Sequence, residues 1–267
     1  MSETNDNQER SRKTVLGFVL LQDANFDWPR FRHNLKEDWD ISFSDEIKDG
    51  AVVFSADDYN CACSLLPNPV PNGEAEACAA NNLLWKDGSE EVAKHKAHVM
   101  IAVMDTDANE YYDPVDANLL FCKIASAMLK LGNTIGIYKN PTVFEKKFYI
   151  DVAEHIKAGD LPIPIMLHAG MYKDESGRLC GFTYGLRAYG KEEIEAIGLS
   201  NEPAQLYNFI MALSDYILSG DVTLKDGETV GFTDDQHIPV TLSPVSVVNG
   251  TSLFDGNSLK IGFPAQE

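Results

Sequence analysis

The segment from residue 67 to residue 104 constrains the fold more than any other part of the chain. It begins with Pro67-Asn-Pro-Val-Pro71, continues through a helix-like run to Trp85, and reads His95-Lys-Ala-His98 before an apolar stretch. Prolines fix φ and remove backbone donors, so the first motif ends the strand-like run before it. The segment therefore predicts a stiff turn, a helix, and a buried strand with two histidines at its entrance.

Short apolar runs and capped helices alternate along the rest of the chain. Asp113-Pro114 is typical of a helix start, with an acidic N-cap and proline in the first turn, and Thr142-x-x-Glu145 reads as a capping box. Strands are expected at residues 14–21, 41–44, 51–56, 60–66, 98–104, 134–138, 163–171 and 179–186. Helices are expected at residues 27–39, 74–85, 113–131, 142–157 and 203–218.

This order of elements predicts an α+β fold. We expect two ferredoxin-like halves, each a split β-α-β arrangement, with a mainly antiparallel sheet and helices packed on one face. The expected division is a disordered polar N-terminal tail at residues 1–13, a first half at 14–110, a second half at 111–220 and a Gly-rich β tail at 221–267.

The balance of charge limits the partners. Acidic residues number 41 and basic residues 22, which gives a formal net charge of −19 over 267 residues. Phosphate backbones and anionic lipids repel such a surface, so we expect neither nucleic acid nor membrane as a partner. The charge permits a basic protein partner and leaves the oligomeric state open, and a solubilising role for the excess carboxylates explains it equally.

The cysteines and the N-terminal segment indicate a cytoplasmic protein. Residues 1–13 contain no apolar segment of the kind that a secretory signal needs. The five cysteines are an odd number without metal-ligand spacing, and Cys61 and Cys63 would share one face of a strand, which suits packing. We therefore expect a reducing compartment.

The histidine pair is the strongest candidate for chemistry. On a helix, His95 and His98 would point to one side and could begin a zinc site, recruiting Glu74, Glu76 or Glu91. The simpler interpretation is that His98 begins the strand and hydrogen-bonds a turn while His95 is solvated. We name His95, His98, Glu74 and Trp85 as candidate ligand- or metal-binding residues, without committing to a metal.

Other patterns do not predict a reaction. The series Asp105-x-Asp107-x-Asn109 up to Asp116 imitates a calcium loop, but Glu110 stands where the tight turn needs glycine and a strand precedes it. The chain contains no Walker loop, G-x-G-x-x-G, G-x-S-x-G or H-E-x-x-H motif. We therefore expect no catalytic residues and no cofactor.

A set of short motifs resembles a known family. They include the proline-rich turn with Glu74 and Trp85, the histidine pair, and Gly136-Ile-Tyr138; further on come Phe182-Thr-Tyr-Gly185 with Gly190, and Asp226-Gly-Glu-Thr-Val-Gly231-Phe-Thr233. In order and spacing they resemble the bacterial family catalogued as domain of unknown function 4261, over residues 15–240. The resemblance implies no established reaction, and members are discussed as toxin-immunity or stress-related proteins.

Two functions follow as expectations. The first is a non-enzymatic protein-binding module, immunity- or adaptor-like, that acts through an acidic surface. The alternative is an enzyme or a small-ligand or metal-binding protein that uses His95 and His98 near the turn from Pro67 to Pro71.

Overall fold

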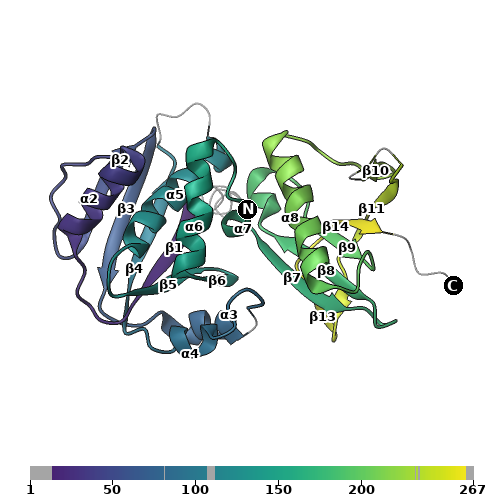
Figure 1. Ribbon diagram of the computed structural model, residues 1–267, viewed down its shortest axis with the longest axis horizontal. Helices are drawn as coiled ribbons and strands as arrows, with labels where there is room; N and C mark the ends of the chain where they lie inside the picture. The colour runs from purple at the N-terminus through teal and green to yellow at the C-terminus, as the bar shows by residue number, and fades with distance from the viewer. Residues whose placement is uncertain (1–13, 81, 107–111, 232, 234, 263–267) are drawn as a thin grey trace, which may run out of the picture. The chain divides into compact units, whose positions relative to one another are not determined.

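The computed structural model describes residues 14–80, 82–106, 112–231, 233 and 235–262, and Figure 1 shows its elements. The contacts divide the chain into two compact units, Met1–Ile165 and Met166–Glu267. Within the described residues, each unit holds a six-stranded sheet, which confirms a mixed α+β fold with mainly antiparallel strands. The prediction of two ferredoxin-like halves is not confirmed, and the division at residue 165 lies inside the expected second half.

The first unit is built on a fully antiparallel sheet of order β2-β3-β4-β1-β5-β6. The central strand β1 runs between β4 and β5, which the helix α5 connects, so this sheet contains one split β-α-β unit. Its strands are β1 (Thr14–Leu21), β2 (Ala51–Ala56), β3 (Tyr59–Leu66), β4 (Ala97–Met104), β5 (Thr134–Lys139) and β6 (Thr142–Glu145).

Three helices lie on one face of this sheet: α2 (Trp28–Trp39), α5 (Pro114–Leu129) and α6 (Lys146–Ala153) (Figure 1). The apolar α5 packs over β4, β1 and β5. A Cβ atom at Gly17 of β1 would lie 2.6 Å from the ring of Phe121, so glycine is what lets α5 approach the sheet. As predicted, Asp113 caps α5, because its Oδ1 accepts from the N–H of Val115 at 2.7 Å.

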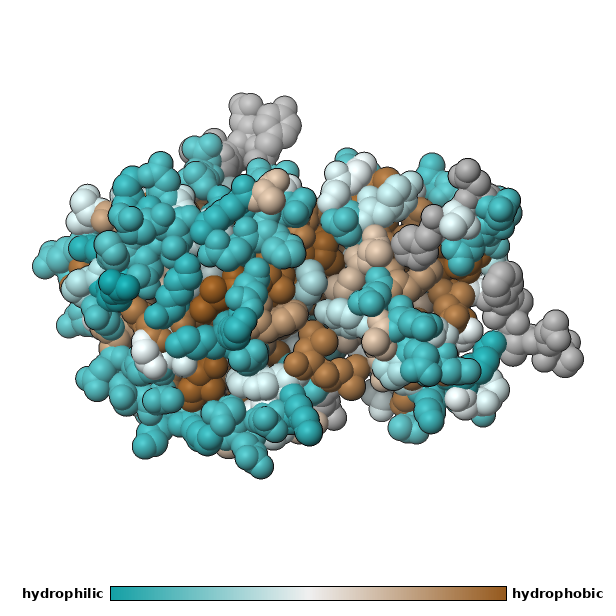
Figure 2. All heavy atoms as spheres, viewed as in Figure 1, coloured by the Kyte–Doolittle hydropathy of each residue, from teal (hydrophilic) through white to brown (hydrophobic). Residues whose placement is uncertain are grey.

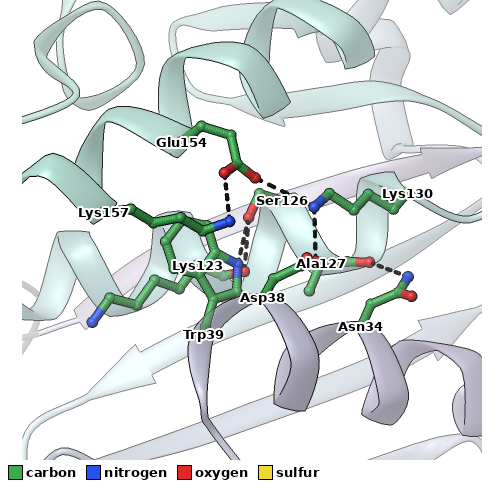
Figure 3. A network of polar contacts seen from close by, with 9 residues as sticks. All are labelled: Asn34, Asp38, Trp39, Lys123, Ser126, Ala127, Lys130, Glu154 and Lys157. Atoms are coloured by element: carbon green, nitrogen blue, oxygen red, sulfur yellow. Dashed lines mark hydrogen bonds and ion pairs between the residues drawn. The ribbon is translucent and has the colours of Figure 1, made fainter.

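A polar network joins the outer sides of these helices (Figure 3). Lys130, at the end of α5, pairs with Asp38 of α2 at 2.8 Å and with Glu154 at 3.4 Å. The indole N–H of Trp39 donates to the hydroxyl of Ser126 at 3.1 Å. The helices are thus fixed to one another by partly exposed ion pairs and by a hydrogen bond to the buried Ser126, and on this side Figure 2 shows the first unit as mainly hydrophilic.

The opposite face of the sheet has its own cover, formed by α3 (Glu74–Ala80) and α4 (Gly88–Val92). This cover lies over β1, β5 and β6, where Leu20, Tyr138 and Val143 form a buried cluster with apolar residues of the two short helices. A Cβ atom at Gly136 of β5 would lie 3.0 Å from the ring of Trp85, so the indole packs directly on the sheet.

The second unit holds the sheet of order β10-β11-β14-β9-β8-β7. The helix α8 (Pro203–Ser219) packs on β7, β8 and β9, and β9 runs parallel to β14. The strands are β7 (His168–Lys173), β8 (Leu179–Tyr184), β9 (Ile194–Ile197), β10 (Thr229–Val230), β11 (Ile238–Pro244) and β14 (Asn257–Gly262), and β12 (Val247–Val248) pairs with β13 (Thr251–Ser252).

Several expected elements differ from the structure. Residues 41–44 are not a strand, and the helix expected to reach Trp85 ends at Ala80 before α4 begins. Residues 142–145 form β6 rather than a capping box, and the side chain of Glu145 instead caps α6 by accepting from the N–H of Phe148. The short helix α7 (Ile163–Met166) replaces the first part of an expected strand.

The expected core of α8 is mostly confirmed. Leu206, Leu213 and Ile217 are buried, whereas Phe209 is only partly buried. Among the residues that the structure describes, no helix combines the length and apolar character needed to cross a bilayer.

Candidate functional site

His95 is buried and holds the turn from Pro67 to Pro71. Its Nε2 accepts a hydrogen bond of 2.9 Å from the backbone N–H of Val70. The neutral ring therefore carries its proton on Nδ1, which donates to the carbonyl of Val92 at 2.6 Å. Both ring nitrogens thus bond to the backbone, and the expectation that His95 is solvated is wrong.

His98 holds the same turn from the start of β4. Its Nδ1 donates to the carbonyl of Asn68 at 2.8 Å, and its ring lies edge-on to Phe18, with 5.4 Å between the centroids. Burial lowers the pKa of His98 below its usual range, although the hydrogen bond to Asn68 opposes this shift. The prediction that His98 lies at the start of the strand and hydrogen-bonds a turn is confirmed.

The other candidate ligands lie in the same cover of the sheet. Glu74 opens α3, and its Oε2 accepts from the hydroxyl of Tyr138 at 3.3 Å. Trp85 is partly buried against the cluster that contains Leu20 and Val143. The fold therefore brings Glu74 and Trp85 into the layer that the two histidines pin to the sheet.

The carboxylates that were expected beside the histidines lie in different places. Glu76 lies with its Oε1 3.6 Å from Nδ1 of His95, whereas Glu91 pairs with Lys94 at 2.6 Å. Across the described part of the chain, no three His, Cys, Asp or Glu side chains form a group that could hold a metal ion. A ligand or metal role for His95, His98, Glu74 and Trp85 stays a prediction. The centre of the calcium-like pattern, residues 107–111, lies outside the described residues.

The cysteines pack as the sequence predicts. Cys61 and Cys63 lie buried on the helix-covered face of β3, and burial raises the pKa of Cys61 to about 12. Cys122 and Cys180 are also buried, and burial raises the pKa of each thiol. High thiol pKa values are the opposite of what a nucleophilic cysteine needs.

Among the residues that the structure describes, the sheet face opposite α5 is partly exposed beyond the cover formed by α3 and α4. There the register aligns Leu16, Ala102, Ala62 and Val53 as successive neighbours across β1, β4, β3 and β2. Val53 is 59% exposed and Leu16 is 44% exposed. We call the alternate strand residues of this region the open sheet face: Thr14, Leu16, Ala51, Val53, Ser55, Asn60, Ala62, Ser64, Met100, Ala102 and Met104.

None of these residues is charged, although 24% of the chain is. A sheet face that meets water usually carries polar and charged side chains, and lysine in particular protects exposed strands from unwanted pairing. Seven of the eleven residues are apolar, and an uncharged, mainly apolar patch on a strongly charged protein is a feature that surfaces in contact with another protein share. Sequence reasoning missed this face, because β2 and β4 are apolar on both sides and only the register joins the residues of the face.

One end of the open sheet face is acidic. Asp57 and Asp58 form the turn between β2 and β3, and Asp105 follows β4. The register places Asn60 beside Met104, so the three aspartates lie at the same end of the sheet. The Asp57 side chain is 63% exposed, and its Oδ2 lies 3.9 Å from the ammonium of Lys123.

Two buried carboxylates hold the second unit together. Glu193 accepts from the hydroxyl of Thr183 and the N–H of Gly185, each at 2.8 Å. Glu195, on β9, accepts from the hydroxyl of Tyr172 at 2.8 Å and from the N–H of Ser246 at 3.0 Å. These contacts tie the turn after β8 and the connection between β11 and β14 to the sheet. The sequence analysis did not predict β9, whose four residues give little periodicity.

Residues 182–254 match the family model described as Domain of unknown function (DUF4261). The match confirms the resemblance for the part that contains the motifs from Phe182 to Gly190 and from Asp226 to Thr233, together with both buried glutamates. The motifs before residue 182 lie outside the matched segment. Neither a curated protein nor a solved structure matches the chain significantly.

Proposed function

We propose that this protein is a non-enzymatic binding module, immunity- or adaptor-like, that docks a basic protein on the open sheet face. The observation that carries the proposal is the set of uncharged strand residues beside an acidic rim in a chain of net charge −19. The proposal assumes a bacterial cytoplasm, which accords with five free cysteines.

The chemistry of the face defines the partner. Val53 on β2 and Leu16 on β1 offer exposed apolar side chains on the two outer strands of the face, which favour an apolar counterpart. Asp57, whose side chain is 63% exposed, favours lysine or arginine at one edge of that counterpart. A second copy of this chain fits less well, because it would bring another net charge of −19 and no basic edge.

The size of the face suits the centre of an interface. Strands lie about 4.8 Å apart and alternate residues about 7 Å apart, so four strands with two or three such residues each cover on the order of 300 Å². A standard interface buries about 800 Å² per partner, with an apolar centre and a polar rim. The acidic end and neighbouring loops would then supply the rim.

Affinity capture with matched variants tests the proposal. Immobilised protein captures binders from a bacterial lysate, and the binder that mass spectrometry identifies is purified for titration. Val53→Glu introduces a buried charge at the interface and should weaken binding at least about tenfold. Val247→Glu, equally apolar and 62% exposed in the second unit, is the control and should bind like the wild type.

Three readouts must agree. The binder should be basic, its affinity should fall as salt rises, and only the Val53 variant should lose it. Capture of no basic protein, affinity indifferent to salt, or equal loss in both variants would each overturn the proposal. Circular dichroism of both variants establishes that the fold is retained.

A further inference from the structure

The outer edge of β2 turns backbone groups away from the sheet. β2 is the first strand in the order β2-β3-β4-β1-β5-β6, so only one of its sides pairs with a neighbouring strand. The N–H of Leu65 donates to the carbonyl of Gly50 at 2.8 Å, and these two residues lie opposite each other just beyond the register of β2 with β3. In an antiparallel ladder, hydrogen-bonded pairs alternate with pairs whose N–H and C=O groups point away from the partner strand. Residues 52, 54 and 56 therefore bond to β3, and residues 51, 53 and 55 present their backbone to the outside.

Two of the outward residues keep their backbone groups unpaired. Ala51 follows the alternation, because its N–H donates to the carbonyl of Lys48 and its carbonyl accepts from the N–H of Lys48, each at 2.9 Å. That bridge closes the edge at one end and leaves Val53 and Ser55. Within the described part of the chain, no hydrogen bond reaches the backbone N–H or C=O of Val53 or Ser55 from the outer side of β2. Two donors and two acceptors thus lie at successive outward positions.

β2 also lacks the features that usually protect a sheet edge. Natural edge strands are kept from pairing with other chains by lysine, by proline, by a bulge or by being very short. β2 reads AVVFSA over six residues, contains neither a charged residue nor proline, and pairs with β3 in continuous register. The residues Val53 and Ser55 are exposed, so an approaching strand would meet them. The edge is therefore suited to accept a further strand.

The surroundings of the edge favour a basic strand. Asp57, in the turn that directly follows β2, has a side chain that is 63% exposed. All strand pairs of this sheet are antiparallel, and an antiparallel strand beside Val53 and Ser55 would bring lysine or arginine near Asp57 at one of its ends. A second copy of this chain would bring another net charge of −19, which opposes the pairing of two β2 edges.

We propose that the basic partner binds by adding an extended strand to the outer edge of β2. This inference rests on the proposed function and specifies how the partner is held. The added strand exchanges backbone hydrogen bonds with Val53 and Ser55, and a basic side chain lies near Asp57. Val53 and Ser55 also belong to the open sheet face, so the added strand enlarges that face and the rest of the partner covers it.

A defined peptide tests the edge in the full-length protein. The probe is acetyl-Lys-Thr-Thr-Val-Val-Thr-Lys-amide, which has a β-prone centre and a basic residue at each end. In an NMR titration it should shift the amide resonances of Val53 and Ser55 saturably. The same peptide with both valines N-methylated has lost a donor on each of its edges and should bind at least about tenfold more weakly. Glutamate in place of both lysines should also weaken binding at least about tenfold.

Two variants of Ser55 test the same contact from the side of the protein. Ser55→Pro removes an outward N–H and places a ring in the path of the added strand, whereas the ladder with β3 keeps its bonds. It should weaken binding of the peptide and of the captured partner at least about tenfold. Ser55→Ala is the matched control. Both variants lose the hydrogen bond from the Ser55 hydroxyl to Asn60, but alanine keeps the N–H and should bind like the wild type.

The outcomes separate this inference from the proposed function. If Val53→Glu abolishes binding of the captured partner while Ser55→Pro binds it like the wild type, the partner docks on the open sheet face without adding a strand, and only this inference is overturned. Absence of a saturable shift at Val53 and Ser55, or equal binding of the N-methylated peptide, would overturn it as well. A dimer of this chain that Ser55→Pro dissociates would assign the edge to a second copy and contradict the inference. Circular dichroism verifies the fold of both Ser55 variants.

Discussion

Two halves of one sheet face differ in what covers them. In the covered half, Leu20 of β1 is wholly buried beneath the layer that contains α3 and α4. In the open half, Leu16 lies on the same face of the same strand, four residues before Leu20, and is 44% exposed. Both halves carry apolar side chains, so composition does not distinguish them; the presence of a cover does.

In the covered half, several polar contacts hold the covering segments on the sheet face. His95 and His98 pin the turn from Pro67 to Pro71 through its backbone, and the turn places Val70 in the buried cluster. On the helix side, a network around Lys130 fixes the covering helices. The open half has no comparable cover among the described elements, and for this reason we propose that a partner docks there.

The largest expected contrast comes from the two leucines of β1. Leu20→Ala should lower the free energy of unfolding by about 2–5 kcal/mol, because it leaves a cavity under the cover. Leu16→Ala should cost less than about 1 kcal/mol, because the side chain is already partly in water. Urea unfolding followed by tryptophan fluorescence measures both, since Trp28, Trp39 and Trp85 all lie in the first unit. Equal losses would show that the open half is covered after all.

Enlarging a small residue gives the next contrast. Gly136→Ala should cost about 1–3 kcal/mol, because the new Cβ would lie 2.5 Å from the carbonyl oxygen of Phe144 and 3.0 Å from the ring of Trp85. Ala62→Val, on the open half, should be neutral within about 0.5 kcal/mol, since a β-branched residue suits a strand and meets no cover. The same unfolding measurement applies. A large loss in the Ala62 variant would contradict the account.

The smallest expected effect is a dependence of stability on pH, which arises from His98 in the cover. Burial lowers the pKa of His98, so between that pKa and the ordinary value of about 6.5 the unfolded chain binds more protons than the folded one. The contribution of His98 to stability is therefore complete above about pH 6.5 and is lost as the pH falls.

Unfolding at pH 7.5 and pH 5.5 measures this loss, with His98→Gln as the comparison. The variant should lose less stability than the wild type on acidification. His168 in the second unit, whose pKa burial lowers to about 4, changes stability in the same direction in both proteins, so the difference isolates His98. An identical loss in the two proteins would mean that His98 does not resist protonation.

The sequence predicted the elements whose signals are local. Thr14–Leu21 and Trp28–Trp39 form where the apolar run and the Asp27 cap placed them. The role of His95 was not predictable in this way, because its partner Val70 lies 25 residues away and only the fold brings them together. Glu195 likewise gains its partners from Tyr172 and Ser246, on separate parts of the chain.

To predict the open sheet face, the strand register is needed as well as the residue pattern of each strand. One side of each of β2, β3 and β4 carries no charged residue, but only the order β2-β3-β4-β1 joins these sides into one surface. The prediction of a capping box at Thr142 failed for the opposite reason. The local pattern favours a helix start, but Val143 and Phe144 are buried in a strand that pairs with β5.

Hydroxyl-radical footprinting of the complex with the captured basic partner tests the central claim most directly. Met100 and Met104 lie on the open sheet face and are partly exposed, and Met171 of β7 is similarly exposed in the other unit. The account predicts that the partner protects Met100 and Met104 from oxidation and leaves Met171 unchanged. Oxidation of Met100 and Met104 at the same rate with and without the partner would contradict it.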